Sequence, residues 1–271
     1  MKHTAYPCAK INLGLNIVER RPDRYHNIET IFYPIPLCDE LEIEESAEDN
    51  LILSGIPVAG ELNDNLVMKV LSQLRADHDI PPVCITLKKN IPSGAGLGGG
   101  SSDAAETMKA LNSMFDLGMG HEEMERRVAK LGADCAFFIK REPTVAKGIG
   151  NIFTPTDVNL EGLYLALIKP DEFVSTKEAY SLVTPQKPKT PVEEVVKRPI
   201  REWKTLLKND FEASVFTKHP IISEIKENLY ILGAEYVSMS GSGSSVFGLF
   251  KNKPKDIDFV FGQHFTFTSK L

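Results

Sequence analysis

The feature that most constrains this sequence is a glycine-rich run between a predicted strand and a predicted helix. Five of the seven residues from Gly94 to Gly100 are glycine. Val83–Lys88 has strand-forming residues, and Asp103 and Glu106 stand at capping-box spacing before a helical pattern. Glycines before a helix let the backbone approach a ligand closely, and the first N–H groups of a helix attract anions. The run therefore predicts a phosphate-binding loop, and its simpler alternatives are a flexible loop and a tight strand-to-helix turn.

Two common phosphate sites do not fit this run. Gly94, Gly96 and Gly99 match the spacing of the dinucleotide fingerprint, which requires an acidic residue at a strand end about 20 positions later. The residue found there, Glu122, falls in a predicted helix. The P-loop is excluded as well, because the sequence contains no Gly-Lys-Ser or Gly-Lys-Thr.

Charge and cysteine content exclude several other classes. The chain has 31 Lys and Arg against 37 Asp and Glu, and this formal charge of −6 disfavours nucleic-acid binding. The four cysteines, Cys8, Cys38, Cys84 and Cys135, form no CxxC pair, which indicates reduced thiols in a cytoplasmic protein. The N-terminus lacks the apolar segment of a signal peptide. Apolar runs such as Leu163–Ile168 are far shorter than the roughly 20 residues that span a bilayer, so no membrane partner is expected.

Strand and helix patterns alternate irregularly in both halves, which predicts an α+β fold. Lys10–Val18 alternates with a period of two, so we expect a half-buried strand that places Lys10 and Asn12 side by side on the face away from the core. A domain boundary is expected near residue 150, giving domains 1–150 and 151–271. A helix over His121–Leu131, stopped by Gly132, leads directly to Asp134.

Other elements are predicted from shorter patterns. A helix capped by Asp64 carries the stripe Leu66, Val70 and Leu74, and Ser175–Leu182 has a capping-box start. The remaining predicted strands are Ile28–Tyr33, Asp39–Glu44, Asn50–Ser54 and Leu163–Lys169; helices are expected near Arg201–Lys208 and Ile221–Leu232, and a hairpin with a Gly241–Ser244 tip at Tyr236–Phe250.

Four segments together resemble one enzyme family. Pro92-Ser-Gly-Ala-Gly-Leu-Gly-Gly-Gly-Ser-Ser-Asp-Ala-Ala105 is similar to the second motif of the GHMP small-molecule kinases, and Ser240–Ser244 is similar to the third. Ala9–Leu15 with the later Arg21–His26 resembles the opening of the members that act on a cytidine diphosphate compound. Gly132-Ala133-Asp134 resembles the family's catalytic aspartate segment.

The resemblance implies a two-domain GHMP kinase fold, with a ribosomal-protein-like N-terminal domain and a ferredoxin-like C-terminal domain. It implies ATP and Mg²⁺, with Ser102 as a hydroxyl near the metal and Asn65 beside adenine, although an asparagine there also has a local explanation. No metal-ligand cluster is predicted. The expected ATP-binding loop consists of Pro92, Ser93, Gly94, Ala95, Gly96, Leu97, Gly98, Gly99, Gly100, Ser101 and Ser102.

The resemblance also assigns the catalytic pair. Asp134 would accept the proton of the acceptor hydroxyl, and Lys10 would lie between Asp134 and the γ-phosphate, while Asn12 would position the acceptor. Without the resemblance, Lys10 is an ordinary solvated lysine and Asp134 is a helix N-cap. A ligand role for the Gly241–Ser244 tip and a plain hairpin turn are equally compatible with the sequence.

The implied substrate is 4-diphosphocytidyl-2-C-methyl-D-erythritol, phosphorylated on its 2-hydroxyl in the non-mevalonate isoprenoid pathway. Tyr25 would stack on its cytosine, His26 would hydrogen-bond the base edge, and Tyr180 would be a second stacking ring. Arg24 departs from the family pattern, because glycine is usual there and a glycine reaches positive φ easily. The alternatives are another GHMP kinase, acting on homoserine, mevalonate or a sugar, and a non-catalytic RNA-binding module. We expect a monomer or a weak homodimer.

Overall fold

The computed structural model describes residues 1–58 and 60–271, and their contacts divide the chain into two compact units. Unit 1 comprises Met1–Ala9, Leu37–Ser93 and Gly98–Glu142, and unit 2 comprises Lys10–Pro36, Gly94–Leu97 and Pro143–Leu271. Each unit combines segments far apart in the sequence. The units therefore do not coincide with the expected domains 1–150 and 151–271, and that division into two domains stays a prediction.

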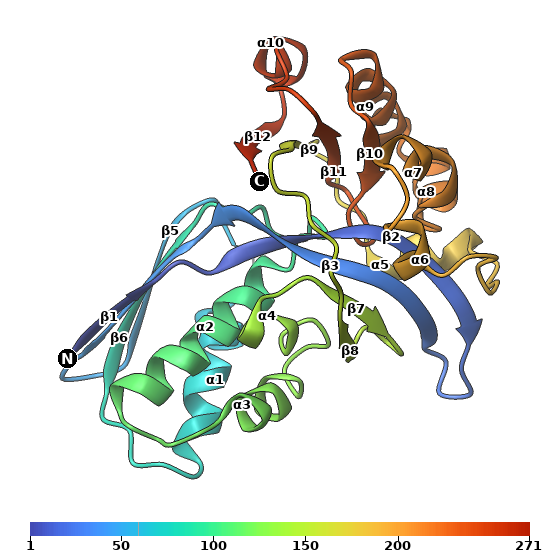
Figure 1. The fold of residues 1–271 in the computed structure, drawn as a ribbon. Helices are drawn as coiled ribbons and strands as arrows, with labels where there is room; N and C mark the ends of the chain where they lie inside the picture. Colours follow the sequence, from blue (N-terminus) through green and yellow to red (C-terminus); the bar gives the residue numbers. More distant parts are fainter. Residues whose placement is uncertain (59) are drawn as a thin grey trace. The chain divides into compact units, whose positions relative to one another are not determined.

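Unit 1 is a four-stranded sheet covered by helices (Figure 1). The strand order is β1 (Lys2–Ala5), β4 (Glu40–Glu45), β6 (Val83–Lys89) and β5 (Asn50–Gly55), and β5 runs parallel to β6. A 3-10 helix, Leu62–Asp64, precedes α1 (Leu66–Arg75), α2 (Gly99–Met114), α3 (His121–Val128) and α4 (Phe137–Lys140). Helix α2 contacts β1, β4 and the other three helices, so its residues Ala104, Met108 and Leu111 lie in the core.

Three helix ends of unit 1 differ from the predictions. Asn65, not Asp64, caps α1, because the Asn65 side chain accepts a hydrogen bond from the N–H of Val67. Helix α2 begins at Gly99, four residues before the predicted cap Asp103, because Gly98 takes a left-handed conformation (φ 71°) that ends the loop there. Helix α3 ends at Val128 rather than at Leu131.

Unit 2 contains two further sheets. The first has the order β2 (Cys8–Arg20), β3 (His26–Cys38), β7 (Thr144–Lys147) and β8 (Ile152–Pro155). The first two residues of β2 and the last two of β3 are counted with unit 1. The second has the order β10 (Tyr236–Met239), β11 (Val246–Phe250), β9 (Tyr164–Lys169) and β12 (Phe265–Lys270), paired antiparallel throughout.

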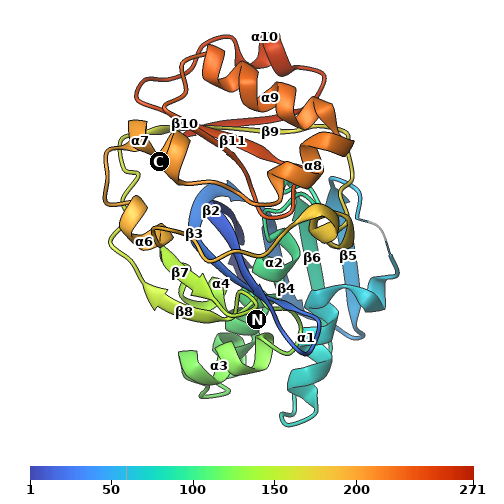
Figure 2. The same cartoon turned by 90° about the vertical axis from the view of Figure 1, so that its right-hand side faces the viewer.

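The helices of unit 2 all lie between β9 and β12 in the chain, and all but the last precede β10. They are α5 (Thr176–Ala179) with a 3-10 turn at Tyr180–Leu182, α6 (Val192–Val195), α7 (Ile200–Leu206), α8 (Glu212–Lys218), α9 (Pro220–Ile231) and α10 (Ile257–Phe261). Figure 2 shows α9 lying along the second sheet, where it contacts β10 and β11. Its buried residues Ile222, Ile225 and Leu229 belong to one hydrophobic cluster with residues of β2, β9 and β10.

The second sheet of unit 2 has the β-α-β-β-α-β chain order of ferredoxin-like folds. This confirms the predicted α+β class. Within residues 1–58 and 60–271, the helices are too short or too polar to cross a membrane.

Candidate active site

Lys10 lies on β2 in a buried polar environment. Its Nζ atom donates to Asn12 Oδ1 at 2.7 Å and to the carbonyl oxygen of Gly96 at 3.0 Å, and it lies 4.9 Å from the centre of the Phe32 ring. Lys10 is only 3% exposed and Asn12 only 1%. The prediction that this strand face points away from the core is therefore wrong, because residues distant in the sequence cover it.

One of these covering segments is the predicted third motif. The hydroxyl of Ser240 donates to the carbonyl oxygen of Gly96 at 2.9 Å, and Ser245 N–H donates to Ala95 O at 3.3 Å. A Cβ on Gly96, whose φ is +75°, would lie 2.0 Å from the Ser240 carbonyl oxygen. The predicted tip does join β10 and β11, and it packs against Gly94–Leu97 of the glycine loop instead of extending as a plain solvent-exposed turn.

The second part of the glycine loop begins α2 in unit 1. Gly98 offers no side-chain cap, so the first N–H groups of α2 have no acceptor within the helix. The first intrahelical bond of this turn runs from Ser102 N–H to Gly98 O at 2.9 Å. The Ser102 hydroxyl oxygen is buried and has no hydrogen-bond partner among the described residues. This turn can bind an anion.

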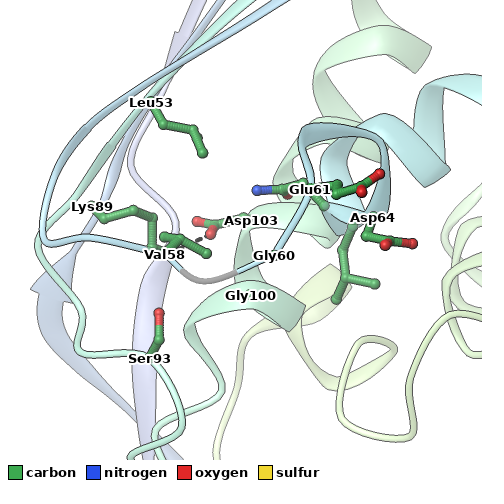
Figure 3. Close-up of a pocket in the computed structure, with 11 residues that line it drawn as sticks. Leu53, Val58, Gly60, Glu61, Asp64, Lys89, Ser93, Gly100 and Asp103 are labelled. Atoms are coloured by element: carbon green, nitrogen blue, oxygen red, sulfur yellow. Dashed lines mark hydrogen bonds and ion pairs between the residues drawn. The ribbon is translucent and has the colours of Figure 1, made fainter.

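A pocket of unit 1 opens beside this turn (Figure 3). Three residues predicted to bind the nucleotide, Asn65, Ser93 and Gly100, line it, and apolar side chains such as Leu53 and Val58 face the same space. A largely apolar pocket next to the first N–H groups of a helix suits a base attached to a phosphate chain.

Two acidic residues that the sequence analysis did not assign to the site hold a buried lysine at the edge of this pocket. Lys89 forms ion pairs with Asp39 and Asp103, and all three side chains are at most 4% exposed. Asp39 also accepts hydrogen bonds from the N–H groups of Asn90 and Ile91, just before the glycine loop. Burial raises the pKa of Asp103 to about 8. The capping-box spacing of Asp103 concealed this cluster, since it offered a simpler role for the residue.

Asp134 lies half-buried in the turn between α3 and α4, and Ala136, not Asp134, occupies the N-cap position of α4. Next to it, burial raises the pKa of the Cys135 thiol to about 11, and the Ser101 side chain hydrogen-bonds that thiol. A Cβ on Gly132 would lie 3.2 Å from Cys135 Sγ and 3.8 Å from Ser101 Oγ. The structure therefore brings the predicted aspartate segment next to the first turn of α2. Lys10 belongs to unit 2 and Asp134 to unit 1, so their pairing stays a prediction.

The three residues predicted to bind cytosine all lie in unit 2. The rings of His26 and Tyr180 stack with their centres 4.5 Å apart and their planes 17° from parallel, and Tyr180 meets Phe211 edge-on at 4.7 Å. Tyr25 is 63% exposed. Burial, followed by the charge of Arg20, lowers the pKa of His26. The His26–Tyr180 stack was not predicted.

The Arg21–Tyr25 turn keeps the backbone form that a glycine would favour. Arg24 has a φ of 71°, in the left-handed region. Arg21 N–H donates to Tyr25 O at 2.8 Å, and Asp23 accepts from both the Arg21 side chain and the Tyr25 N–H. Arg24 therefore adopts the positive φ that a glycine reaches easily, and local hydrogen bonds hold it there.

Two family models match the chain. The model for the GHMP kinases N terminal domain matches residues 65–142, and the model for the GHMP kinases C terminal matches residues 192–260. A 4-diphosphocytidyl-2-C-methyl-D-erythritol kinase of Bacteroides fragilis is 53% identical over 270 residues, covering 98% of both chains. The equally named protein of Parabacteroides distasonis is 54% identical over 246 residues, covering 91% of both.

Solved structures of GHMP kinases are also similar to this chain. A crystal structure of 4-(cytidine 5'-diphospho)-2C-methyl-D-erythritol kinase is similar at 30% identity and a TM-score of 0.84, covering 99% of this chain and 100% of that one. Homoserine kinase from Cytophaga hutchinsonii has a TM-score of 0.64 at 15% identity, covering 97% of this chain and 94% of the other, which shows a shared fold alone.

Proposed function

Because this chain belongs to the GHMP kinase family, we propose that it transfers the γ-phosphoryl group of ATP to the 2-hydroxyl of 4-diphosphocytidyl-2-C-methyl-D-erythritol. The products would be ADP and the 2-phosphate, in the non-mevalonate route to isoprenoid precursors. The family membership predicted from four motifs is confirmed. The names of the similar proteins favour the cytidine compound over homoserine, mevalonate or a sugar as the substrate.

The observation that carries this proposal is the buried Lys10 ammonium, held against the glycine loop at the Gly96 carbonyl oxygen. Burying a cation is costly unless it is paired or hydrogen-bonded, so a buried ammonium beside this loop suits a site that binds negative charge. Phosphoryl transfer needs positive charge beside the moving group and a base for the attacking hydroxyl. Lys10 would supply the charge and orient Asp134, and Asp134 would accept the hydroxyl proton.

The N–H groups at the start of α2 would bind the phosphates of ATP, as the helix dipole favours anions there. The loop Pro92–Ser102 would wrap the phosphate chain, and the pocket at Asn65 and Leu53 would hold the adenine. Asn65 already caps α1 with its side-chain oxygen, so its side-chain N–H₂ group is the part that it can offer to the base.

The residues present fit a Mg²⁺ ion bound together with ATP. The buried Ser102 hydroxyl oxygen lacks a partner among the described residues, and a hydroxyl is a suitable Mg²⁺ ligand. Residues 1–58 and 60–271 contain no cluster of three or more acidic, histidine or cysteine side chains that would hold a metal without the nucleotide. Phosphate oxygens and water would therefore complete its coordination. When bound, Mg²⁺ would neutralise charge on the triphosphate.

Tyr25, His26 and Tyr180 would bind the cytosine ring, and Asn12 would position the acceptor alcohol. Tyr25 is exposed and so available to stack on a base, and His26 is mostly neutral near pH 7 because its pKa is lowered. A neutral imidazole has one donor and one acceptor nitrogen, which suits the mixed edge of cytosine.

The decisive experiment measures ADP release and product phosphorylation by the wild type and by the variants Asp134→Asn and Lys10→Ala. We expect loss of turnover of about a hundred-fold or more in both, since each removes a group that acts in the transition state. Asp79→Asn and Lys187→Ala are matched controls, because these residues are exposed in loops. Near-native turnover of both site variants would refute the assigned roles.

The substrate class is tested in the same assay. Homoserine, mevalonate and a hexose are offered in place of the cytidine compound, and CMP is added as a competitor. Phosphorylation of a simple alcohol without inhibition by CMP would favour another GHMP activity. Salt-dependent RNA binding without turnover would favour the RNA-binding alternative. We also propose that the enzyme acts in the cytoplasm as a monomer or weak homodimer, which fits four cysteines that form no disulfide in the described chain.

A further inference from the structure

Four polar side chains, that of Lys10 among them, are buried together in unit 2. Lys10, Asn12, Thr30 and Ser240 are each at most 3% exposed. Buried polar groups are stable only when their donors meet acceptors. The hydrogen bonds of this cluster therefore determine which way each side chain faces.

The Thr30 hydroxyl has a fixed role in this cluster. It donates its only hydrogen to the carbonyl oxygen of Gly14, so its oxygen can only accept from Asn12. The Asn12 side chain donates to this oxygen through its Nδ2 atom, which lies 3.0 Å from Thr30 Oγ1. The opposite orientation of the amide would place its oxygen against a hydroxyl with no hydrogen left to give.

This orientation of Asn12 reaches the proposed catalytic lysine. With Nδ2 on Thr30, the Oδ1 atom of Asn12 faces Lys10 and accepts from its Nζ at 2.7 Å. A reversed amide would set the N–H₂ group against the ammonium, so that two donors would meet in a buried place. Lys10 would then keep the Gly96 carbonyl oxygen, which it shares with the Ser240 hydroxyl, but it would lose the bond to Asn12.

We propose that Thr30 is a positioning residue for the kinase reaction: it orients the Asn12 amide, and the amide in turn aims the Lys10 ammonium. The same orientation leaves the second N–H of Asn12 as the donor that it can offer to the acceptor alcohol. The inference rests on the proposed function, since it gives Lys10 and Asn12 their roles. No local sequence pattern marks Thr30, because its partners lie on the neighbouring strand β2.

The test compares Thr30→Val, which keeps the side-chain shape and removes the hydroxyl, with Thr30→Ser, which keeps the hydroxyl. At saturating substrates we expect Thr30→Val to lower kcat by about ten-fold or more, as for a lost buried hydrogen bond, with the KM for ATP changed by less than about two-fold. Thr30→Ser is expected to recover most of kcat. Melting temperatures and folded fractions are measured so that kcat is expressed per folded molecule.

A double-mutant cycle separates positioning from simple structural support. If Thr30 acts through Asn12, then Thr30→Val lowers kcat no further once Asn12→Ala is present, whereas independent effects would multiply. Wild-type kcat in Thr30→Val, multiplying effects in the cycle, or a folded Thr30→Ser that fails to recover activity would each overturn the proposal.

A readout without turnover keeps this inference separate from the proposed function. A crystal structure of Thr30→Val is expected to show Lys10 Nζ moved away from the side chain of residue 12. An unchanged Lys10–Asn12 contact would overturn the relay even if the enzyme proved to phosphorylate another alcohol. Failure of the wild type to turn over the cytidine compound would instead overturn the proposed substrate and leave this structural comparison valid.

Discussion

The glycine loop offers a sharp test, because two of its glycines share one backbone conformation and differ in their surroundings. Gly94 has a φ of +63° and Gly96 a φ of +75°. An added Cβ on Gly94 would lie 3.2 Å from the Phe173 ring, and Phe173 is 72% exposed. An added Cβ on Gly96 would lie 2.0 Å from the backbone oxygen of Ser240. The first neighbour is free to rotate away, whereas the second is main chain.

These distances set the expected energies. Both alanine variants pay about 1–2 kcal/mol for a left-handed residue, and both gain the same small amount from a stiffer unfolded chain. Gly96→Ala must in addition displace a backbone carbonyl, for which overpacking costs of about 1–3 kcal/mol apply. We therefore expect Gly96→Ala to be less stable than Gly94→Ala by about 1–3 kcal/mol. It should also lose far more activity, because the Gly96 carbonyl is an acceptor for Lys10.

Urea unfolding followed by circular dichroism gives the stability difference, and ADP release at saturating substrates gives the activity of the folded fraction. Equal stability and equal turnover of the two variants would show that the glycine loop and Ser240 are not packed as described. A large loss in Gly94→Ala alone would contradict the reasoning more directly, since it would place the tight contact at the wrong glycine.

Three further predictions rest on single residues. Asn65→Ala should cost about 1 kcal/mol of stability by urea unfolding and raise the KM for ATP, whereas Asn65→Asp should keep the cap and its stability. Cys38 should react with iodoacetamide faster as the pH rises through about 7, because a hydrogen bond from Cys8 lowers the Cys38 pKa to about 7 and the thiolate is the reactive form. Lys89→Met should destabilise the protein by about 3–5 kcal/mol, because two buried carboxyl groups lose their cation.

Each of these predictions has an outcome that contradicts it. Equal stability of Asn65→Ala and Asn65→Asp would contradict the cap prediction. For the thiol, peptide mapping would find the pH-dependent label on another cysteine, and Cys38→Ser would not abolish it. For the ion cluster, Lys89→Met would unfold at the wild-type urea concentration.

The elements with regular periodicity were predictable from the sequence. β9 and α9 lie close to the predicted ranges, and Ser175 caps α5 as its spacing indicates. The four-residue strand β7 has no such pattern, and it pairs through the backbone with β3, which lies far earlier in the chain. Its existence depends on a tertiary contact that local residues do not encode. β12 does alternate aromatic and polar residues, so its sequence carries a strand signal.

The candidate site also has features that the sequence predicts and features that only the fold creates. The glycine loop follows from composition, because five glycines before a helix have few other uses. The burial of Lys10 does not follow, because Ser240 covers it from 230 positions further along the chain. The ion cluster at Lys89 was concealed for a related reason: Asp103 has a plausible local role as a cap, and only the fold brings Asp39 to it.

The stack of His26 on Tyr180 has a consequence for the proposed binding of cytosine in unit 2. Their ring centres are 4.5 Å apart, so the imidazole covers one face of the Tyr180 ring. A cytosine that stacks on this face, with His26 at its edge, must first displace the imidazole and so competes with an internal partner. The affinity of the protein for the base is reduced by roughly 0.5–1.5 kcal/mol, the worth of the aromatic pair that is broken. In the free protein, the same pair keeps the stacking face of Tyr180 from collapsing or from capturing unrelated planar molecules.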